Sequence, residues 1–125
     1  STDYIDSDVI AMARTDGDTC VQVFFIRGGK LIGREYFLLE GADDTQDGDV
    51  LASFLKQFYD QAPTVPSQVL LPIEIEEHRV IREWLNTRRG GEKVELFIPL
   101  DGPQQELVQM ATDNARATLA SLKAQ

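Results

Sequence analysis

The chain has 125 residues, 42% of them hydrophobic and 26% charged, which is the composition of one globular domain and excludes a disordered segment. No apolar run reaches the roughly 18 residues of a membrane span, and the N-terminus lacks the basic start and apolar stretch of a signal peptide. The net charge of −9 predicts long-range repulsion of a phosphate backbone, so the isolated chain is expected to bind nucleic acid weakly.

The first half of the chain predicts an antiparallel meander of three strands. Residues 1–7 are mostly polar and are interpreted as the end of a linker. Apolar and polar residues then alternate with the period of a strand. Asp16-Gly17 and the glycines of the Arg-Gly-Gly-Lys segment favour tight turns, because glycine accepts a positive φ. We expect the strands at residues 8–14, 19–26 and 31–39.

The second half predicts strands that alternate with helices. Asp49 is the expected N-cap of a first helix, which Pro63 and Pro66 terminate. The apolar segment Val69–Pro72 is typical of a strand buried on both faces, as in a parallel pair. The remaining elements are expected as a strand at 67–72, a helix at 74–89, a strand at 93–99 and a helix at 101–122.

The element order is therefore βββαβαβα, in one α/β domain over residues 8–123. An antiparallel start followed by β–α crossovers predicts a mixed sheet with helices on its faces. This is the order of the ribonuclease H-like fold.

The chain contains one cysteine, Cys20, and one histidine, His78. A single cysteine cannot form a disulfide within the chain, which favours a reducing, cytoplasmic setting. Zinc sites of the usual four-ligand kind are excluded by the same count. Cys20 lies in an apolar strand with no histidine nearby in sequence, so we expect a packed thiol rather than a nucleophile.

Three segments, Val21–Arg34, Val69–Pro72 and Glu106–Ala115, occur in an order and spacing that resembles the UvrC family. UvrC is the nuclease subunit of the bacterial excision-repair nuclease, and the resemblance covers roughly residues 8–122. It implies that the chain is a fragment of a larger protein. The fragment would lie between the helical hairpin that binds UvrB and the 5′ nuclease domain.

The resemblance also implies what the parent protein does. UvrC proteins incise damaged DNA on both sides of a lesion in nucleotide excision repair, with UvrB and damaged DNA as partners and Mg²⁺ or Mn²⁺ in the nuclease. The Gly-Phe-Asp-Ile-Ser sequence of the family's nuclease strand is absent from this chain. We therefore expect a non-catalytic module without a cofactor, which contacts neighbouring UvrC domains and no membrane.

Ribonuclease H chemistry needs clustered carboxylates that hold two divalent metals about 4 Å apart. The middle of the first strand, Ile10–Ala13, carries no acid, and the fourth strand ends in Leu71-Pro72. We therefore assign no catalytic or metal-binding residue and expect solvated carboxylates at strand and helix ends. An active site of unusual layout would bind a divalent metal through Asp8 with Glu40 or Glu74.

Glu74 and His78 would lie four residues apart on the predicted second helix, where a two-ligand metal site is conceivable. The simpler explanation for Glu74, Glu76 and Glu77 is the positive end of the helix dipole, which favours acidic side chains. We therefore expect His78 to be an ordinary surface residue.

Two basic clusters are candidates for contact with DNA phosphates or with a partner protein. The first, around the second turn, comprises Arg27, Lys30 and Arg34. The second, in the second helix, comprises Arg79, Arg82, Arg88 and Arg89. Either cluster could instead be a solvated face or a contact between domains. The functions left open are a module that positions the 5′ nuclease, an active metal nuclease, and a stand-alone acidic protein-interaction module.

Overall fold

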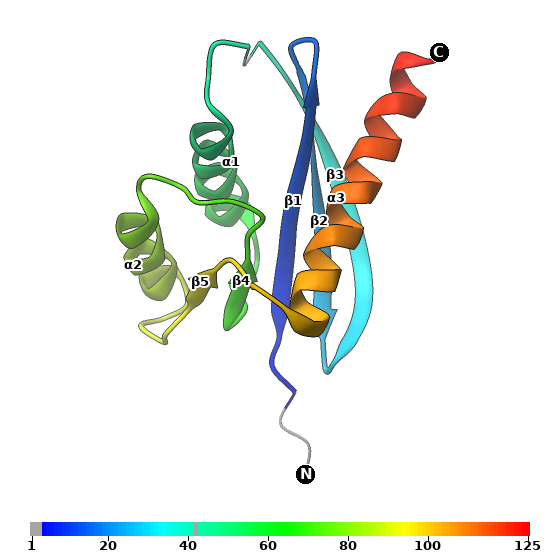
Figure 1. The fold of residues 1–125 in the computed structure, drawn as a ribbon. Helices are drawn as coiled ribbons and strands as arrows, with labels where there is room; N and C mark the ends of the chain where they lie inside the picture. The colour runs from blue at the N-terminus through cyan, green and yellow to red at the C-terminus, as the bar shows by residue number, and fades with distance from the viewer. Residues whose placement is uncertain (1–3, 42) are drawn as a thin grey trace.

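Five strands form one mixed sheet in the computed structural model, which describes residues 4–41 and 43–125 (Figure 1). The predicted order βββαβαβα is confirmed. The elements are β1 (Ser7–Thr15), β2 (Asp18–Arg27), β3 (Lys30–Glu40), α1 (Asp47–Gln61), β4 (Gln68–Leu70), α2 (His78–Arg88), β5 (Glu95–Phe97) and α3 (Gly102–Lys123).

The strand order across the sheet is β3-β2-β1-β4-β5. The first three strands pair antiparallel, and β4 joins β1 in parallel with Val69 opposite Asp8. The strand β5 then pairs in parallel with β4. All three residues of β4 are buried, as expected for a short strand inside a parallel arrangement.

Helices cover both faces of this sheet, with α1 and α2 on one side and α3 on the other (Figure 1). Because side chains alternate along β1, Ile10 packs into the core beneath α1, whereas Val9 and Ala11 pack against α3. Cys20 is fully buried on the α3 side, and burial raises the pKa of its thiol. The expectation of a packed thiol is met. No helix in the described part of the chain is long and apolar enough to cross a membrane.

Two helix starts differ from the sequence prediction. The N-cap of α1 is Gln46 rather than Asp49, so Asp49 lies within the first turn, where its charge still favours the helix dipole. The helix α2 begins at His78 rather than at residue 74. Residues 74–77 are irregular because the side chain of Ile75 turns into the core beside α1.

Smaller differences concern the strands and the start of the domain. The strand expected at 93–99 is regular only over β5. The strand β1 begins at Ser7, one residue before the expected start of the first strand. Residues 1–3 of the expected linker lie outside the described residues. The last helix begins as predicted, with Asp101 at the N-cap and Pro103 in the first turn.

The irregular segment before α2 passes so close to Gly48 that a side chain there has no room. A Cβ on Gly48 would lie 2.8 Å from the carbonyl oxygen of Glu74. We therefore expect Gly48→Ala to lower the free energy of unfolding by about 1–3 kcal/mol, as overpacking does. Helix propensity alone would give the opposite sign, a gain of about 1 kcal/mol.

Urea denaturation of the two chains measures this difference. Ser53→Ala, on the exposed side of α1, is the matched control and should cause no loss of stability. A Gly48→Ala chain as stable as the original would contradict the close approach.

Candidate functional site

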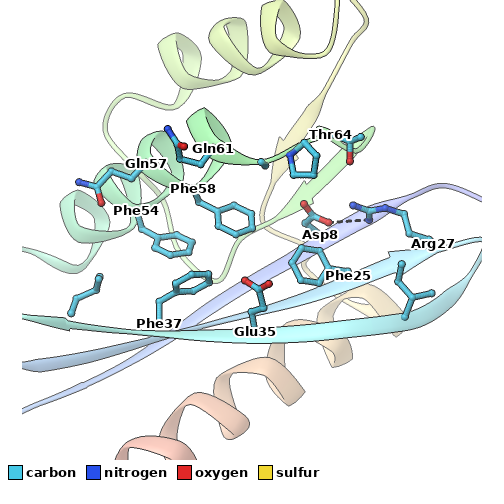
Figure 2. A pocket seen from close by; sticks show the side chains of 14 residues that line it. Asp8, Phe25, Arg27, Glu35, Phe37, Phe54, Gln57, Phe58, Gln61 and Thr64 are labelled. Carbon is cyan, nitrogen blue, oxygen red and sulfur yellow. Dashed lines mark ion pairs between the residues drawn. The ribbon is translucent and has the colours of Figure 1, made fainter.

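A groove of about 660 Å³ lies between α1 and the adjoining face of β2 and β3 (Figure 2). Phe25 and Phe37 line it from the strands, and Phe54 and Phe58 line it from α1. The rings of Phe37 and Phe54 lie 5.1 Å apart, and those of Phe54 and Phe58 lie 5.4 Å apart and are stacked. We call this the phenylalanine groove. Sequence reasoning missed it because an alternating aromatic pattern equally fits a closed core.

Asp8 lies at one end of the phenylalanine groove, beside Arg27 (Figure 2). Its side chain is only 1% exposed. The hydroxyl of Tyr59 donates a hydrogen bond of 2.6 Å to Oδ2, and Nη1 of Arg27 lies 2.9 Å from Oδ1. Nη1 donates its hydrogen bonds to the carbonyl oxygens of Ser7 and Ile26. Asp8 Oδ1 therefore forms an ion pair with the guanidinium but accepts no hydrogen bond among the described residues.

This arrangement corrects the expectation for Asp8. A solvated carboxylate was expected at the entrance of the first strand, whereas Asp8 is a buried ion-pair partner that connects β1, β2 and α1. Burial raises the pKa of Asp8 above its usual value, although Tyr59 and Arg27 both act in the other direction. The same burial, together with the Asp8 carboxylate, raises the pKa of the Tyr59 phenol.

The other candidate carboxylates do not join Asp8. Glu40 ends the edge strand β3, and Glu74 precedes α2; both are exposed. The spacing argument for Glu74 and His78 is wrong, because Glu74 is not helical. Nε2 of His78 lies 2.5 Å from the carbonyl oxygen of Leu96, which can only accept, so this nitrogen carries a proton. Across residues 4–41 and 43–125, no group of three or more His, Cys, Asp or Glu could hold a metal ion.

A second pocket, of about 310 Å³, lies at the carboxyl ends of the parallel strands, where open α/β sheets usually bind ligands. Met12 lines it from the middle of β1, and Leu71 and Pro72 line it directly after β4. Asp47 is the one carboxylate among its described lining residues, and it forms an ion pair of 2.8 Å with Arg14. Apolar side chains thus occupy the strand positions where this chemistry would need acids.

The first basic cluster has one internal and two surface members. Arg27 is held by Asp8, whereas Lys30 and Arg34 are exposed and make no ion pair among the described residues. The cluster lies at the β2–β3 turn, far from α2 (Figure 1). The structure therefore does not merge the two predicted clusters into one basic surface.

The second basic cluster also divides. The guanidinium of Arg88 donates to the backbone carbonyls of Tyr59, Asp60 and Ala62, where α1 ends. Arg88 thereby stabilises the negative end of α1. Arg79 forms an ion pair with Glu83, and Arg82 is half-buried. Arg89 donates a hydrogen bond to the carbonyl oxygen of Lys93 and forms an ion pair with Glu92.

The raised pKa of Asp8 predicts a specific pH dependence. Above its raised folded pKa, the charged carboxylate bears the cost of desolvation in the folded chain; well below the usual value of 3.8 it is neutral in both states. The folded chain therefore binds more protons than the unfolded chain between these limits, and Asp8 contributes stability that is lost as the pH rises through its folded pKa.

We expect the unfolding free energy of the original chain, minus that of Asp8→Asn, to increase as the pH falls from about 7 to about 4. Urea denaturation at several pH values measures it, and the difference isolates Asp8 because the two chains share every other titratable group. A difference that is constant, or that decreases toward acid, would contradict the assigned direction.

Comparison with known proteins agrees with this fold. The family model described as UvrC Ribonuclease H-like domain matches residues 6–122. The chain is 46% identical over 123 residues to the UvrABC system protein C of Acetivibrio thermocellus, covering 98% of this chain and 20% of that protein. It is 43% identical over 111 residues to the same protein of Clostridioides difficile, covering 89% and 18%.

The chain thus spans about a fifth of the length of these curated relatives. A third relative, the UvrABC system protein C of Alkaliphilus oremlandii, is 46% identical over 114 residues, which are 91% of this chain and 18% of that protein. The resemblance noted in the sequence is confirmed. A chain with this sheet order, matched over nearly its whole length, belongs to the family of UvrC ribonuclease H-like domains.

Proposed function

We propose that this chain is a non-catalytic module of a UvrC protein, which positions the 5′ nuclease domain and contacts a partner protein. The observation that carries the proposal is the pair of apolar side chains that line the second pocket from the middle of β1 and from the residue directly after β4. Met12 and Leu71 stand there, where a two-metal nuclease requires carboxylates.

The nearby acids do not replace these missing ligands. Magnesium and manganese prefer oxygen ligands, and the thioether of Met12 is a soft sulfur ligand. Asp47 is already paired with Arg14, and Asp8 is buried between Arg27 and Tyr59. A divalent cation of the parent nuclease would therefore bind in another domain of the longer protein.

The packing supports a positioning role. Helices pack on both faces of one sheet, and the buried Asp8 joins β1, β2 and α1, which makes a rigid body of a kind that can hold two neighbouring domains at a set separation. In the parent protein we expect UvrB, damaged DNA and neighbouring UvrC domains as partners, in the cytoplasm. The name of the relatives, UvrABC system protein C, supports this assignment.

Contact with DNA is the second candidate activity. Lys30 and Arg34 at the β2–β3 turn are the exposed members of the first basic cluster and favour it. The net charge of −9 opposes it, because the whole domain repels phosphates over a Debye length of about 8–10 Å. We therefore expect protein contact rather than DNA contact from the module itself.

The non-catalytic assignment predicts no metal-dependent cleavage. Supercoiled plasmid incubated with the chain and Mg²⁺ or Mn²⁺ should stay uncut, and calorimetric titration with Mn²⁺ should give no binding heat. Metal-dependent nicking that Asp47→Asn or Asp8→Asn abolishes, in a chain whose circular dichroism is unchanged, would show an active nuclease and overturn the proposal.

The protein-contact assignment predicts that the chain does not bind DNA. Fluorescence anisotropy of a labelled duplex, at low salt with Mg²⁺, should detect no binding up to about 100 µM chain, the weak end of non-specific affinity. Salt-sensitive binding that Lys30→Ala with Arg34→Ala weakens would instead make the β2–β3 turn a DNA contact. Arg79→Ala with Arg82→Ala is the matched pair, because it removes the same charge from α2.

A further inference from the structure

Among the described residues, no strand pairs with the outer side of the edge strand β3. It lies at one end of the sheet, where β2 is its neighbour, and is 11 residues long, whereas β5 at the other edge has three residues. An open edge of this length exposes backbone N–H and C=O groups that another strand can pair with. The register with β2 is continuous over residues 33–40 and shifts between Phe25 and Ile26, and residues 34–40 lie within this regular part.

Apolar side chains lie on both faces of this edge. On the face toward α3, the side chains of Tyr36 and Leu38 are 52% and 50% exposed, since α3 packs on β1 and β2. On the face toward α1, Phe37 and Leu39 line the phenylalanine groove. The stretch contains no proline, and Glu35, which also lines the groove, is its one charged residue on the face toward α1.

The sequence of the edge is complementary to itself. If a second copy pairs antiparallel with Phe37 opposite Phe37, then Tyr36 lies opposite Leu38 of the second copy. Arg34 then lies opposite Glu40 of the second copy, and each of these pairs occurs twice. Directly opposed residues share a face of the sheet, so the apolar pairs and the charge pairs are in reach of one another.

The charges select this register over its neighbours. If the two strands paired with Glu35 opposite Glu35, two carboxylates would face each other. If they paired with Tyr36 opposite Tyr36, or with Leu38 opposite Leu38, Arg34 would no longer face Glu40 of the second copy. Within one copy, Glu40 lies opposite another acid, Asp18, across β2. Arg34 and Glu40 make no ion pair among the described residues. Arg34 of the second copy would therefore supply the cation that Glu40 lacks.

We propose that two copies of this chain associate through β3, antiparallel over residues 34–40 and centred on Phe37, so that the two sheets become one. The occupant of the open edge is thus a second copy of the chain. The proposal is independent of the role of the module in the parent protein, because it rests on the strand alone.

Analytical ultracentrifugation of the 125-residue chain tests the association. We expect a monomer–dimer equilibrium between about 10 µM and about 1 mM, since a single strand pair is a small interface. Physiological salt, with a Debye length of about 8 Å, screens the repulsion between two acidic copies. A chain that is monomeric at every concentration would overturn the proposal.

Charge reversal tests the register. Arg34→Glu and Glu40→Arg each convert two attractive cross-strand pairs into two repulsive ones, so each should weaken dimerisation roughly tenfold or more. An equal mixture of the two variants should restore it, because a glutamate at position 34 then faces an arginine at position 40. This rescue also shows that both variants are folded.

Glu106→Arg on the exposed face of α3 is the matched control, since it changes the net charge by the same amount as Glu40→Arg. It should leave dimerisation at or above that of the original chain. A dimer that neither β3 variant weakens, or a mixture that stays monomeric, would show that the copies do not pair in this register and would refute the proposal.

Discussion

The buried contact of Asp8 with Arg27 and Tyr59 is the constraint on which the rest of the domain depends. It joins the central strand β1, its antiparallel neighbour β2 and the helix α1. The hydroxyl from α1 belongs to Tyr59, which is 51 residues from Asp8 in the sequence. Removing a carboxylate and a guanidinium from water costs several kcal/mol per ion, which the pair repays only with good geometry. The position of α1 against the sheet, and with it the phenylalanine groove, is therefore tied to one side chain.

The same contact uses the Asp8 carboxylate for packing within the domain. A carboxylate near the start of β1 is what a reader of the sequence would first assign to a metal, yet here a cation from β2 and a hydroxyl from α1 hold it. In the middle of β1 and directly after β4, Met12 and Leu71 pack in and against the core. The Asp8 carboxylate thus takes part in the packing of the fold, and folds and the sites placed on them vary independently.

The order of elements was predictable because local signals agree with it. Positive φ at Gly17, Gly28 and Gly29 follows from the tight turns, and alternation marks the strands. The start of α2 was not predictable, because the burial of Ile75 overrides an otherwise helical pattern. Nor were the partners of Asp8 and Arg88, since Tyr59 and the end of α1 are distant in sequence. The phenylalanine groove was not predictable either, because the spacing of aromatic residues in the sequence does not show where a helix and a sheet leave a cavity between them.

The parallel pairing of β1 with β4 has a consequence for the order of folding. Ser7 meets Gln68, so the central strand gains its second neighbour only after some 60 residues have been made, whereas the meander closes through short turns. Strand pairs that are distant in sequence form late, because the entropy cost of closing the long loop between them precedes the gain from their contacts. On the ribosome, an early meander would expose the inner edge of β1 until β4 arrives. During this interval a chaperone or an unwanted strand could pair with the edge of β1 that β4 covers in the finished domain.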